Sequence, residues 1–253
     1  MAIPFHPKVF GFSLNIHLIL EYAAFFISYR YYVYLRKKSA DTISDSNRIS
    51  IILGAAIGAL VGSRLVGFLE NPDMYITWQK IWFLLNTKTI MGGLFGGLLG
   101  VEVAKSLIGE KQSSGDLFTL PLIVGIFIGR IGCFLSGTDE FTYGKITSSF
   151  VGMDLGDGQL RYPLALFELI YLTFLFVFMH HLYRQRKLKS GYLFQLFMIL
   201  YFGFRFFIEF LKPNVFLILG LSSIQWLCIV CLIYYRNFLL LIFKDAYQKI
   251  HLL

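Results

Sequence analysis

Long apolar runs separated by short polar connections dominate the pattern of this chain. Few charges interrupt these runs, and each run has about the length, roughly 20 residues, that an α-helix needs to cross a bilayer. We therefore expect an all-α polytopic membrane protein that forms a single integral-membrane domain over residues 1–253. The pattern predicts about seven transmembrane helices, at about 12–35, 48–69, 89–107, 117–137, 162–182, 190–211 and 217–243.

The composition excludes a soluble domain, because 57% of the residues are hydrophobic and only 15% are charged. A formal net charge of +8 could by itself indicate a nucleic-acid partner. However, the positive charge sits in the short connections between apolar runs. There it acts as a topology signal and as an attraction to anionic lipid headgroups. We therefore expect membrane lipids as partners and no nucleic acid.

Lysine and arginine in the connections set the predicted orientation. The side with the larger share is expected to be cytoplasmic, which places the N-terminus outside and the C-terminus inside and needs an odd number of spans. The N-terminal MAIPFHPKVFGF has no small-residue cleavage site, so the first helix is expected to serve as an uncleaved insertion signal. The cytoplasmic set is Arg36, Lys37, Lys38, Arg48, Lys105, Lys111, Arg184, Arg186, Lys187, Lys189, Lys244 and Lys249, and the outer set is Lys8, Lys80, Lys88, Lys145, Arg161 and Lys212.

An arginine stands well inside the fourth predicted span, in GIFIGRIGCFLSG. A charged side chain at that depth costs roughly 2.5–3.5 kcal/mol on insertion scales, so Arg130 needs a reason to be there. Gly129 and Gly132 flank it and leave room for another helix or a ligand. The helix then runs into Ser136 and Gly137 and a polar loop. This helix alone leaves two interpretations open: an anion site, or a structural arginine paired with a buried carboxylate.

The sixth predicted span contains a second group of polar residues, in YFGFRFFIEFLKP. Tyr201, Arg205 and Glu209 are spaced by four and therefore share one helix face. A cation and an anion one turn apart can offset each other's desolvation, which is the structural alternative. Arg205 is nevertheless expected near the outer leaflet at the depth of Arg130, and a guanidinium fork matches the geometry of phosphate.

Small residues line the second and third predicted spans. Gly54, Gly58 and Gly62 fall every four residues and predict a close helix–helix face. The third span contains two glycine pairs, the first of them Gly92 and Gly93, which allow tight packing or unwinding near a ligand. These glycines are therefore candidates for the wall of a ligand cavity.

Polar residues near the outer ends of the spans complete the candidate set. Arg64 ends the glycine face of the second span, where snorkelling to the interface is the alternative to ligand binding. Glu168 lies within the apolar run of the fifth span. An outer loop at about 138–161, which contains Gly144, is long enough to be functional, although its acidity could equally reflect solvation alone.

Histidines and cysteines show no metal-site spacing. His17 is interpreted as interfacial rather than as a ligand, because no second ligand follows at helical spacing. His180 and His181 are adjacent and point to different faces of a helix. Cys228 and Cys231 form a CxxC inside an apolar run, where simple packing is the better interpretation.

Several of these motifs together resemble the prolipoprotein diacylglyceryl transferases. The resemblance rests on GRIGCFLSG with its outer loop and on LYFGFRFFIEFLKP. The second span ending in GSRLVGFLE, the double-glycine third span, Asp116 before the fourth span, RYPLALFE and GLSSIQW fall in the order of that family. The resemblance covers most of the chain, and seven spans with an outer N-terminus is also the topology of the family.

The resemblance implies a multi-pass enzyme of the bacterial inner membrane that transfers the diacylglyceryl group of phosphatidylglycerol to the lipobox cysteine thiol of prolipoproteins. Glycerol phosphate is released and no cofactor is used. By motif, Arg130 and Arg205 correspond to the two arginines regarded as central to catalysis, and Tyr201 and Glu209 match the residues flanking the second. The expected partners are phosphatidylglycerol and the lipobox peptide. The candidate substrate-binding residues are Arg64, Gly92, Gly93, Gly129, Gly132, Ser136, Gly137, Gly144 and Glu168.

The chain departs from the family pattern at several polar positions. Met91 stands where the family usually has a histidine before the glycine pair, Cys133 replaces an asparagine, and Tyr162 replaces a second histidine. Ser136-Gly137-Thr138 stands where Asn-Gly-Glu is usual. A thioether accepts no proton at neutral pH, so a mechanism with a histidine base cannot run through Met91. A non-catalytic lipid-binding protein and a transferase with a different acceptor therefore remain open as alternatives.

Overall fold

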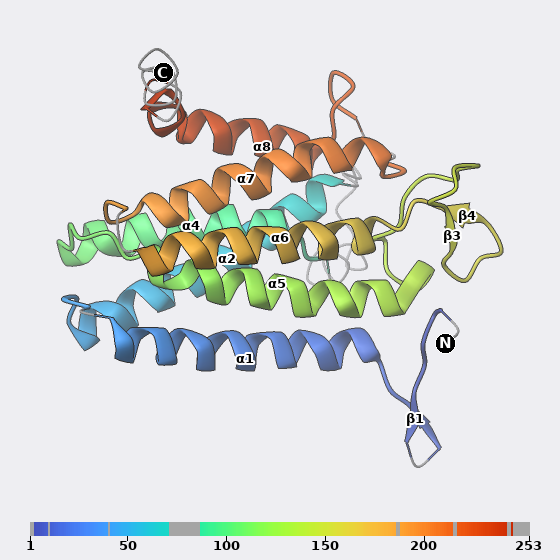
Figure 1. Cartoon of the computed structure of the whole chain (residues 1–253), viewed down its shortest axis with the longest axis horizontal. Helices are drawn as coiled ribbons and strands as arrows, with labels where there is room; N and C mark the ends of the chain where they lie inside the picture. Colours follow the sequence, from blue (N-terminus) through green and yellow to red (C-terminus); the bar gives the residue numbers. More distant parts are fainter. Residues whose placement is uncertain are drawn as a thin grey trace, which may run out of the picture. The chain divides into compact units, whose positions relative to one another are not determined.

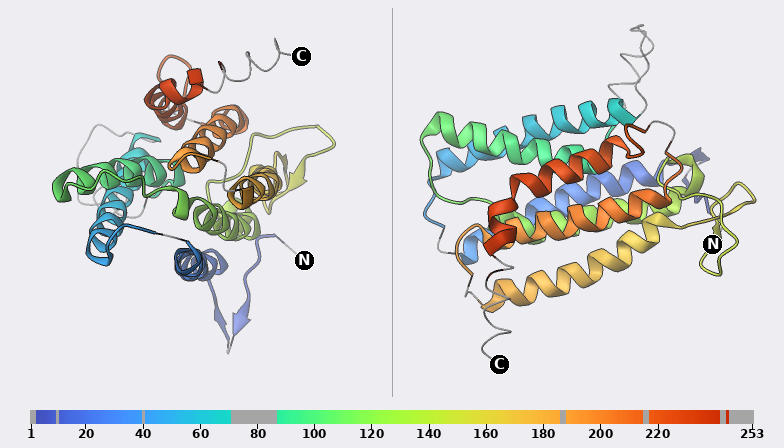
Figure 2. Two further views of the ribbon diagram at one scale, coloured as in Figure 1. Left: turned by 60° about the vertical axis from the view of Figure 1, so that its left-hand side comes forward. Right: turned by 90° about the horizontal axis from the view of Figure 1, so that it is seen from above.

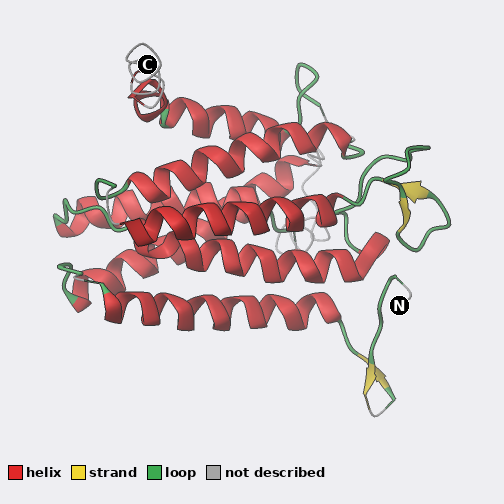
Figure 3. Ribbon diagram, viewed as in Figure 1, coloured by secondary structure: helices red, strands yellow, loops and turns green. Residues whose placement is uncertain are grey.

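The computed structural model describes residues 3–9, 11–39, 41–70, 87–185, 188–214, 217–241 and 244. The described chain is mainly helical (Figure 3) and divides into two compact units. The end of the last predicted span, and Lys80, Arg186, Lys187 and Lys249 of the charge count, lie outside the described residues. The first unit comprises Met1–Thr42, Ser113–Phe194 and Phe210–Pro213, and the second comprises Ile43–Gln112, Gln195–Glu209 and Asn214–Leu253.

Each of the seven predicted spans contains one helix in the described part of the chain, the last of which has only 12 residues. Five of these helices are long and apolar enough to cross a membrane, namely α2, α4, α5, α6 and α7. The prediction of an all-helical membrane fold is therefore confirmed, while seven spans and the orientation of the termini stay predictions. The bounds are α1 Ile16–Lys38, α2 Asp45–Glu70, α4 Ile90–Ile108, α5 Asp116–Ser136, α6 Leu164–Gln185, α7 Tyr192–Ile208 and α8 Ser223–Tyr234.

The first unit is built around α5, which packs between α1 and α6 (Figures 1 and 2). Glycine lets α1 approach closely: a Cβ added at Gly132 would lie 3.3 Å from the Cα of His17. Further along the same contact, the ring of Tyr32 stacks on Phe118 with 4.4 Å between centroids. The hydrophobic helix that carries Arg130 is thus covered on two sides, and about half of its most apolar window is buried.

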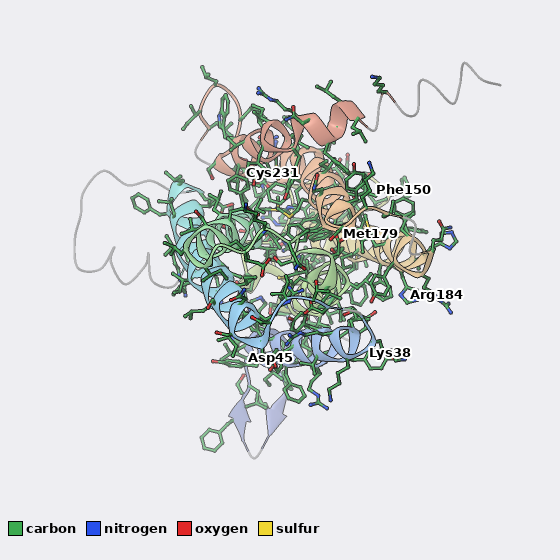
Figure 4. The ribbon with its side chains drawn as sticks, turned by 90° about the vertical axis from the view of Figure 1, so that its left-hand side faces the viewer. Lys38, Asp45, Phe150, Met179, Arg184 and Cys231 are labelled. Atoms are coloured by element: carbon green, nitrogen blue, oxygen red, sulfur yellow. The ribbon has the colours of Figure 1, made fainter. Side chains whose placement is uncertain are left out.

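The two ends of the first unit contain different structural elements. Two short antiparallel hairpins, β1 (Lys8–Val9) with β2 (Phe12–Ser13) and β3 (Met153–Asp154) with β4 (Leu160–Arg161), lie at one end (Figure 1). The last turns of α1 and α6 lie at the other end, where Figure 4 labels Lys38 and Arg184. Of the basic residues that the charge pattern assigned to the cytoplasmic side, Arg36, Lys37, Lys38 and Arg184 therefore share this end of the first unit.

The second unit contains α2 and α4, which pack along the predicted glycine face. A Cβ added at Gly58 would lie 2.3 Å from the carbonyl oxygen of Gly96, and one at Gly62 would lie 2.4 Å from that of Gly92. The two backbones are therefore in contact, and the predicted helix–helix face is confirmed. Because α4 is continuous from Ile90 to Ile108, its glycines serve packing here rather than unwinding.

Polar caps position the remaining helices. The carboxylate of Asp116, at the start of α5, accepts hydrogen bonds from the backbone N–H groups of Gly191 (2.6 Å) and Phe194 (3.0 Å), and so caps the first turn of α7 from another helix. Ser222 and Gln225 form a reciprocal capping box at the start of α8. The side-chain amide of Gln225 also donates to the carbonyl of Phe206 at 3.2 Å.

Candidate functional site

The arginine of α5 is paired with a carboxylate of α6. Arg130 Nε lies 2.9 Å from Glu168 Oε1, and the two residues are 7% and 0% exposed. Such a pair offsets part of the desolvation cost that each charge would carry alone. The buried carboxylate of the structural interpretation therefore exists, and it is Glu168, which the sequence predicts as a substrate-binding residue. The same contact also fixes the direction of the guanidinium.

On its other side, Arg130 reaches a row of three polar side chains. Its Nη1 lies 3.7 Å from Cys133 Sγ, one turn further along α5. Cys133 Sγ lies 3.5 Å from Nε2 of His17 on α1, and His17 Nδ1 lies 3.5 Å from Oε1 of Glu140. The interpretation of His17 as merely interfacial is incomplete, because its partners come from α5 and from the loop that follows it. The spacing of residues within α1 therefore could not indicate these partners.

A cavity of about 240 Å³ opens beside this row. Glu140 and Ser136 line it, together with His6 and Asp139, whose Nε2 and Oδ2 atoms lie 3.3 Å apart. The remaining wall is contributed by the N-terminal segment, at Phe5, Ser13, Leu14, Asn15 and Ile16. Ser136 is thus a predicted site residue that the structure does bring to a cavity.

Different local contacts explain why glycine stands at each of the predicted positions around α5. Gly132 makes room for α1, as described above, whereas a Cβ at Gly129 would meet no atom of another described element within 4 Å. Gly137 has a φ of +53° and begins the short 3₁₀ helix Gly137–Asp139, where a Cβ would also clash with the Leu155 carbonyl at 2.2 Å. Gly144 donates its N–H to the carbonyl of Tyr162 at 2.9 Å, which holds the loop against the start of α6.

The second arginine group lies in the second unit, near the end of α7. Arg205 Nη2 lies 2.9 Å from Glu209 Oε2, so the predicted pair one turn apart is confirmed. Both side chains are buried, at 6% and 1% exposed. Tyr201, one turn earlier, is fully buried and stacks on Phe197 with 5.8 Å between ring centroids. The three residues therefore share one face.

The other candidates of the second unit surround the start of α4. Arg64 Nη1 donates to the carbonyl of Thr87 at 2.6 Å, just before that helix. A Cβ at Gly92 would lie 2.3 Å from the Gly62 carbonyl, so this glycine faces α2, whereas Gly93 has ordinary clearance. Met91, at the usual histidine position, is 1% exposed. This region belongs to the second unit, whereas the Arg130 region belongs to the first.

Comparison with known proteins decides what kind of protein carries these sites. The family model described as prolipoprotein diacylglyceryl transferase matches residues 5–241. The chain belongs to this family. The match includes Arg130, Arg205, the glycine face of α2 and α4, and Met91.

Curated relatives carry the name phosphatidylglycerol–prolipoprotein diacylglyceryl transferase. One from Nitratidesulfovibrio vulgaris is 33% identical over 189 residues, covering 71% of this chain and 66% of the relative. One from Hydrogenovibrio crunogenus is 30% identical, covering 65% and 61%. One from Rickettsia felis is 34% identical, covering 71% and 72%. The matched region thus spans slightly less than two thirds of the first two relatives.

Proposed function

We propose that this chain is a phosphatidylglycerol–prolipoprotein diacylglyceryl transferase of the bacterial inner membrane. It would move the diacylglyceryl group of phosphatidylglycerol to the lipobox cysteine thiol of a prolipoprotein, without a cofactor. The observation that carries the proposal is the family match over residues 5–241, which includes both buried arginine–carboxylate pairs. The proposed topology has seven spans, with the N-terminus outside and the C-terminus in the cytoplasm.

The arginines are assigned to the phosphate of the lipid. As the sulfur–carbon bond forms, the carbon–oxygen bond to the phosphate breaks and negative charge develops on the leaving group. Preorganised donors that face this charge stabilise the transition state more than the ground state. Arg130 and Arg205 are assigned this role, with Glu209 and Tyr201 orienting Arg205. Glu168 orients Arg130 through the 2.9 Å contact.

The remaining candidates are assigned to the walls of the substrate site. Gly129, next to Arg130, has no atom of another described element within 4 Å of an added Cβ, which would leave space there for a lipid group. Ser136 borders the cavity, and Gly137 and Gly144 shape the loop that would contact the incoming prolipoprotein. The candidate substrate-binding residues of the second unit are Arg64, Gly92 and Gly93, of which Gly92 would act by letting α2 and α4 approach.

The test uses the full chain in phosphatidylglycerol micelles with a lipobox-cysteine peptide, with the peptide product followed by mass. A peptide that gains a diacylglyceryl group, and no gain with Arg130→Ala or Arg205→Ala, is the expected result. Arg184→Ala is the matched control, because Arg184 is an exposed arginine in the last turn of α6. Absence of product with the unaltered chain would overturn the proposal for this substrate pair.

Met91 supports a second candidate, a lipid-binding relative that has lost the chemistry. Its thioether is buried where the family usually has a proton-accepting imidazole. This candidate predicts phosphatidylglycerol binding that Arg130→Ala abolishes, with no transfer even in Met91→His. Transfer to a different thiol-containing acceptor, with the lipobox peptide inert, would instead identify a transferase with another substrate.

A further inference from the structure

The row of side chains beside Arg130 connects a buried thiol to an open cavity. Cys133 Sγ is within 3.5 Å of His17 Nε2, and His17 Nδ1 is within 3.5 Å of Glu140 Oε1. Cys133 is 6% exposed, whereas Glu140 lines the cavity of about 240 Å³. Three elements, α1, α5 and the loop after α5, contribute one residue each. Such an arrangement is a path from the buried arginine to the cavity.

The order of the groups along this path suits proton transfer. A thiol both donates and accepts hydrogen bonds, although weakly, so it can pass a proton on. The two ring nitrogens of a histidine can take a proton on one side and release one on the other. A carboxylate at the second nitrogen orients the ring and stabilises its charged form. The carboxylate of Glu140 would therefore stabilise a protonated His17 in its present position.

A covalent role for Cys133 is chemically unsuitable for this reaction. If its sulfur attacked the glyceryl carbon, the product would be a thioether on the protein. The thiolate that would leave from a thioether is a far poorer leaving group than the phosphate that leaves from a phosphate ester. A second thiol could therefore not displace the lipid from Cys133. Attack by Cys133 would therefore end the reaction rather than advance it.

We propose that Cys133, His17 and Glu140 form a proton relay that deprotonates the acceptor thiol at the Arg130 site. The acceptor S–H gives its proton to Cys133 Sγ while the proton of Cys133 moves to His17 Nε2. The acceptor sulfur then bonds to the glyceryl carbon, and the electron pair of the broken carbon–oxygen bond leaves with the phosphate. His17 returns its extra proton through Glu140 to water in the cavity. Cys133 ends as it began, whereas His17 is left with its proton on Nε2 and returns to the Nδ1–H form by exchanging protons with water before the next transfer.

This relay rests on the proposed transferase function and assigns the base that Met91 cannot supply. Other charged groups that act on it come from every neighbouring element. Arg130 and Glu168 lie on the Cys133 side, Glu21 acts on His17 from the next turn of α1, and His6 and Asp139 line the same cavity as Glu140. The test therefore changes only the three relay residues and holds these groups constant.

The first experiment measures the thiol directly and needs no turnover. The full chain in micelles is treated with iodoacetamide, and alkylation of each cysteine is followed by peptide mass. Cys228 and Cys231 are internal controls, since both are fully buried in α8. His17→Gln and Glu140→Gln are expected to slow alkylation of Cys133 at neutral pH and to leave the two controls unchanged. An unchanged Cys133 rate in His17→Gln would overturn the relay.

The second experiment measures transfer to the lipobox peptide against pH. His17→Gln and Cys133→Ala are each expected to lower the rate at pH 7 by about a hundredfold, the lower range for general base catalysis. Both are expected to recover as pH approaches about 8.5, where an unperturbed thiol ionises unaided. The double variant is expected to lose no more than either single variant, because the residues act in one path. His181→Gln, an exposed histidine of α6, is the matched control.

The outcomes separate the two proposals. Transfer that is equal in His17→Gln and the unaltered chain, or a loss that no pH restores, would overturn the relay while leaving the transferase in place. A diacylglyceryl mass gain on Cys133 itself would overturn it in favour of covalent attack. No transfer by the unaltered chain would overturn the proposed function and, with it, the use of the relay.

Discussion

Arg130 Nε and Glu168 Oε1 lie 2.9 Å apart across the contact between α5 and α6, with both side chains buried. Breaking a buried pair by removing one partner leaves an uncompensated charge, which costs about 3–5 kcal/mol. Glu168→Gln is therefore expected to destabilise the protein by an amount approaching that range and to reduce transfer. Thermal unfolding in micelles measures the first effect.

A matched control and a double variant make this prediction specific. Glu102→Gln removes a half-exposed carboxylate 4.0 Å from Lys105, where a loss of at most about 1 kcal/mol is expected. Arg130→Met combined with Glu168→Gln is expected to recover stability but not transfer. If Glu168→Gln unfolds at the temperature of the unaltered chain, the pair does not carry this energy.

The second arginine group predicts a difference between arginine and lysine. Arg205 presents a planar fork that is fixed by Glu209 at 2.9 Å, and an ammonium cannot reproduce the two parallel hydrogen bonds that such a fork can donate to a phosphate. Arg205→Lys is expected to lower kcat by about tenfold or more while the protein remains folded. Arg184→Lys is the control. Full activity of Arg205→Lys would show that only the positive charge matters.

The helical framework was predictable because lipid imposes strong and simple patterns. Apolar runs of membrane length gave one helix each in the described part of the chain, and glycines spaced by four gave the contact between α2 and α4. The pairing of Arg205 with Glu209 followed from helical spacing alone. Such features are local in the sequence or repeat along one face of a helix, so a single sequence is enough to predict them.

The contacts around Arg130 were not predictable in the same way. Its partner Glu168 lies 38 positions away, and the sequence offered that residue only as a separate candidate. His17 and Cys133 are 116 positions apart. Contacts of this kind depend on which helix packs against which, and the apolar pattern does not fix that order. The replacement of the usual asparagine by Cys133 was the available signal.

Substitution of Asp116, at the start of α5, is expected to lower stability by removing a cap from another helix, α7. Its carboxylate accepts the N–H groups of Gly191 and Phe194, so Asp116→Ala leaves two donors at the start of α7 without this cap. Loss of a helix cap costs about 0.5–2 kcal/mol. Asp116→Asn retains one acceptor oxygen and is expected to lose less. Equal melting temperatures for the two variants in micelles would count against this role.

The hairpin formed by β3 and β4 predicts a pH effect. Arg161 holds the Asp157 carboxylate through Nε and Nη2, each 2.7 Å from Oδ2, and lowers the pKa of Asp157 in the folded hairpin. A carboxyl whose pKa is lower in the folded state stabilises that state above its unfolded pKa, about 3.9, and loses this effect as pH falls through the folded pKa. Arg161→Gln is expected to raise the pKa of Asp157 towards 3.9. Carbon-13 NMR titration of labelled aspartate measures the change, and an unmoved pKa would contradict it.

The glycine face predicts opposite outcomes at two neighbouring positions of α4. A Cβ at Gly96 would lie 2.3 Å from the Gly58 carbonyl, whereas one at Gly97 would make ordinary contacts of 3.4 Å with Ala55 O and 3.6 Å with Ala59 Cβ. Gly96→Ala is expected to destabilise the protein by about 1–3 kcal/mol, because the helices must separate.

Gly97→Ala is the matched control, since both changes add one methyl group to the same helix. Alanine is favoured over glycine in a helix interior by about 1 kcal/mol, so Gly97→Ala is expected to be neutral or stabilising. Thermal unfolding of the two variants in the same micelles gives the comparison directly. If both variants melt alike, the close approach of α2 and α4 does not limit stability. A selective loss in Gly96→Ala would show that backbone contact, rather than helix propensity, determines the glycine content of this pair.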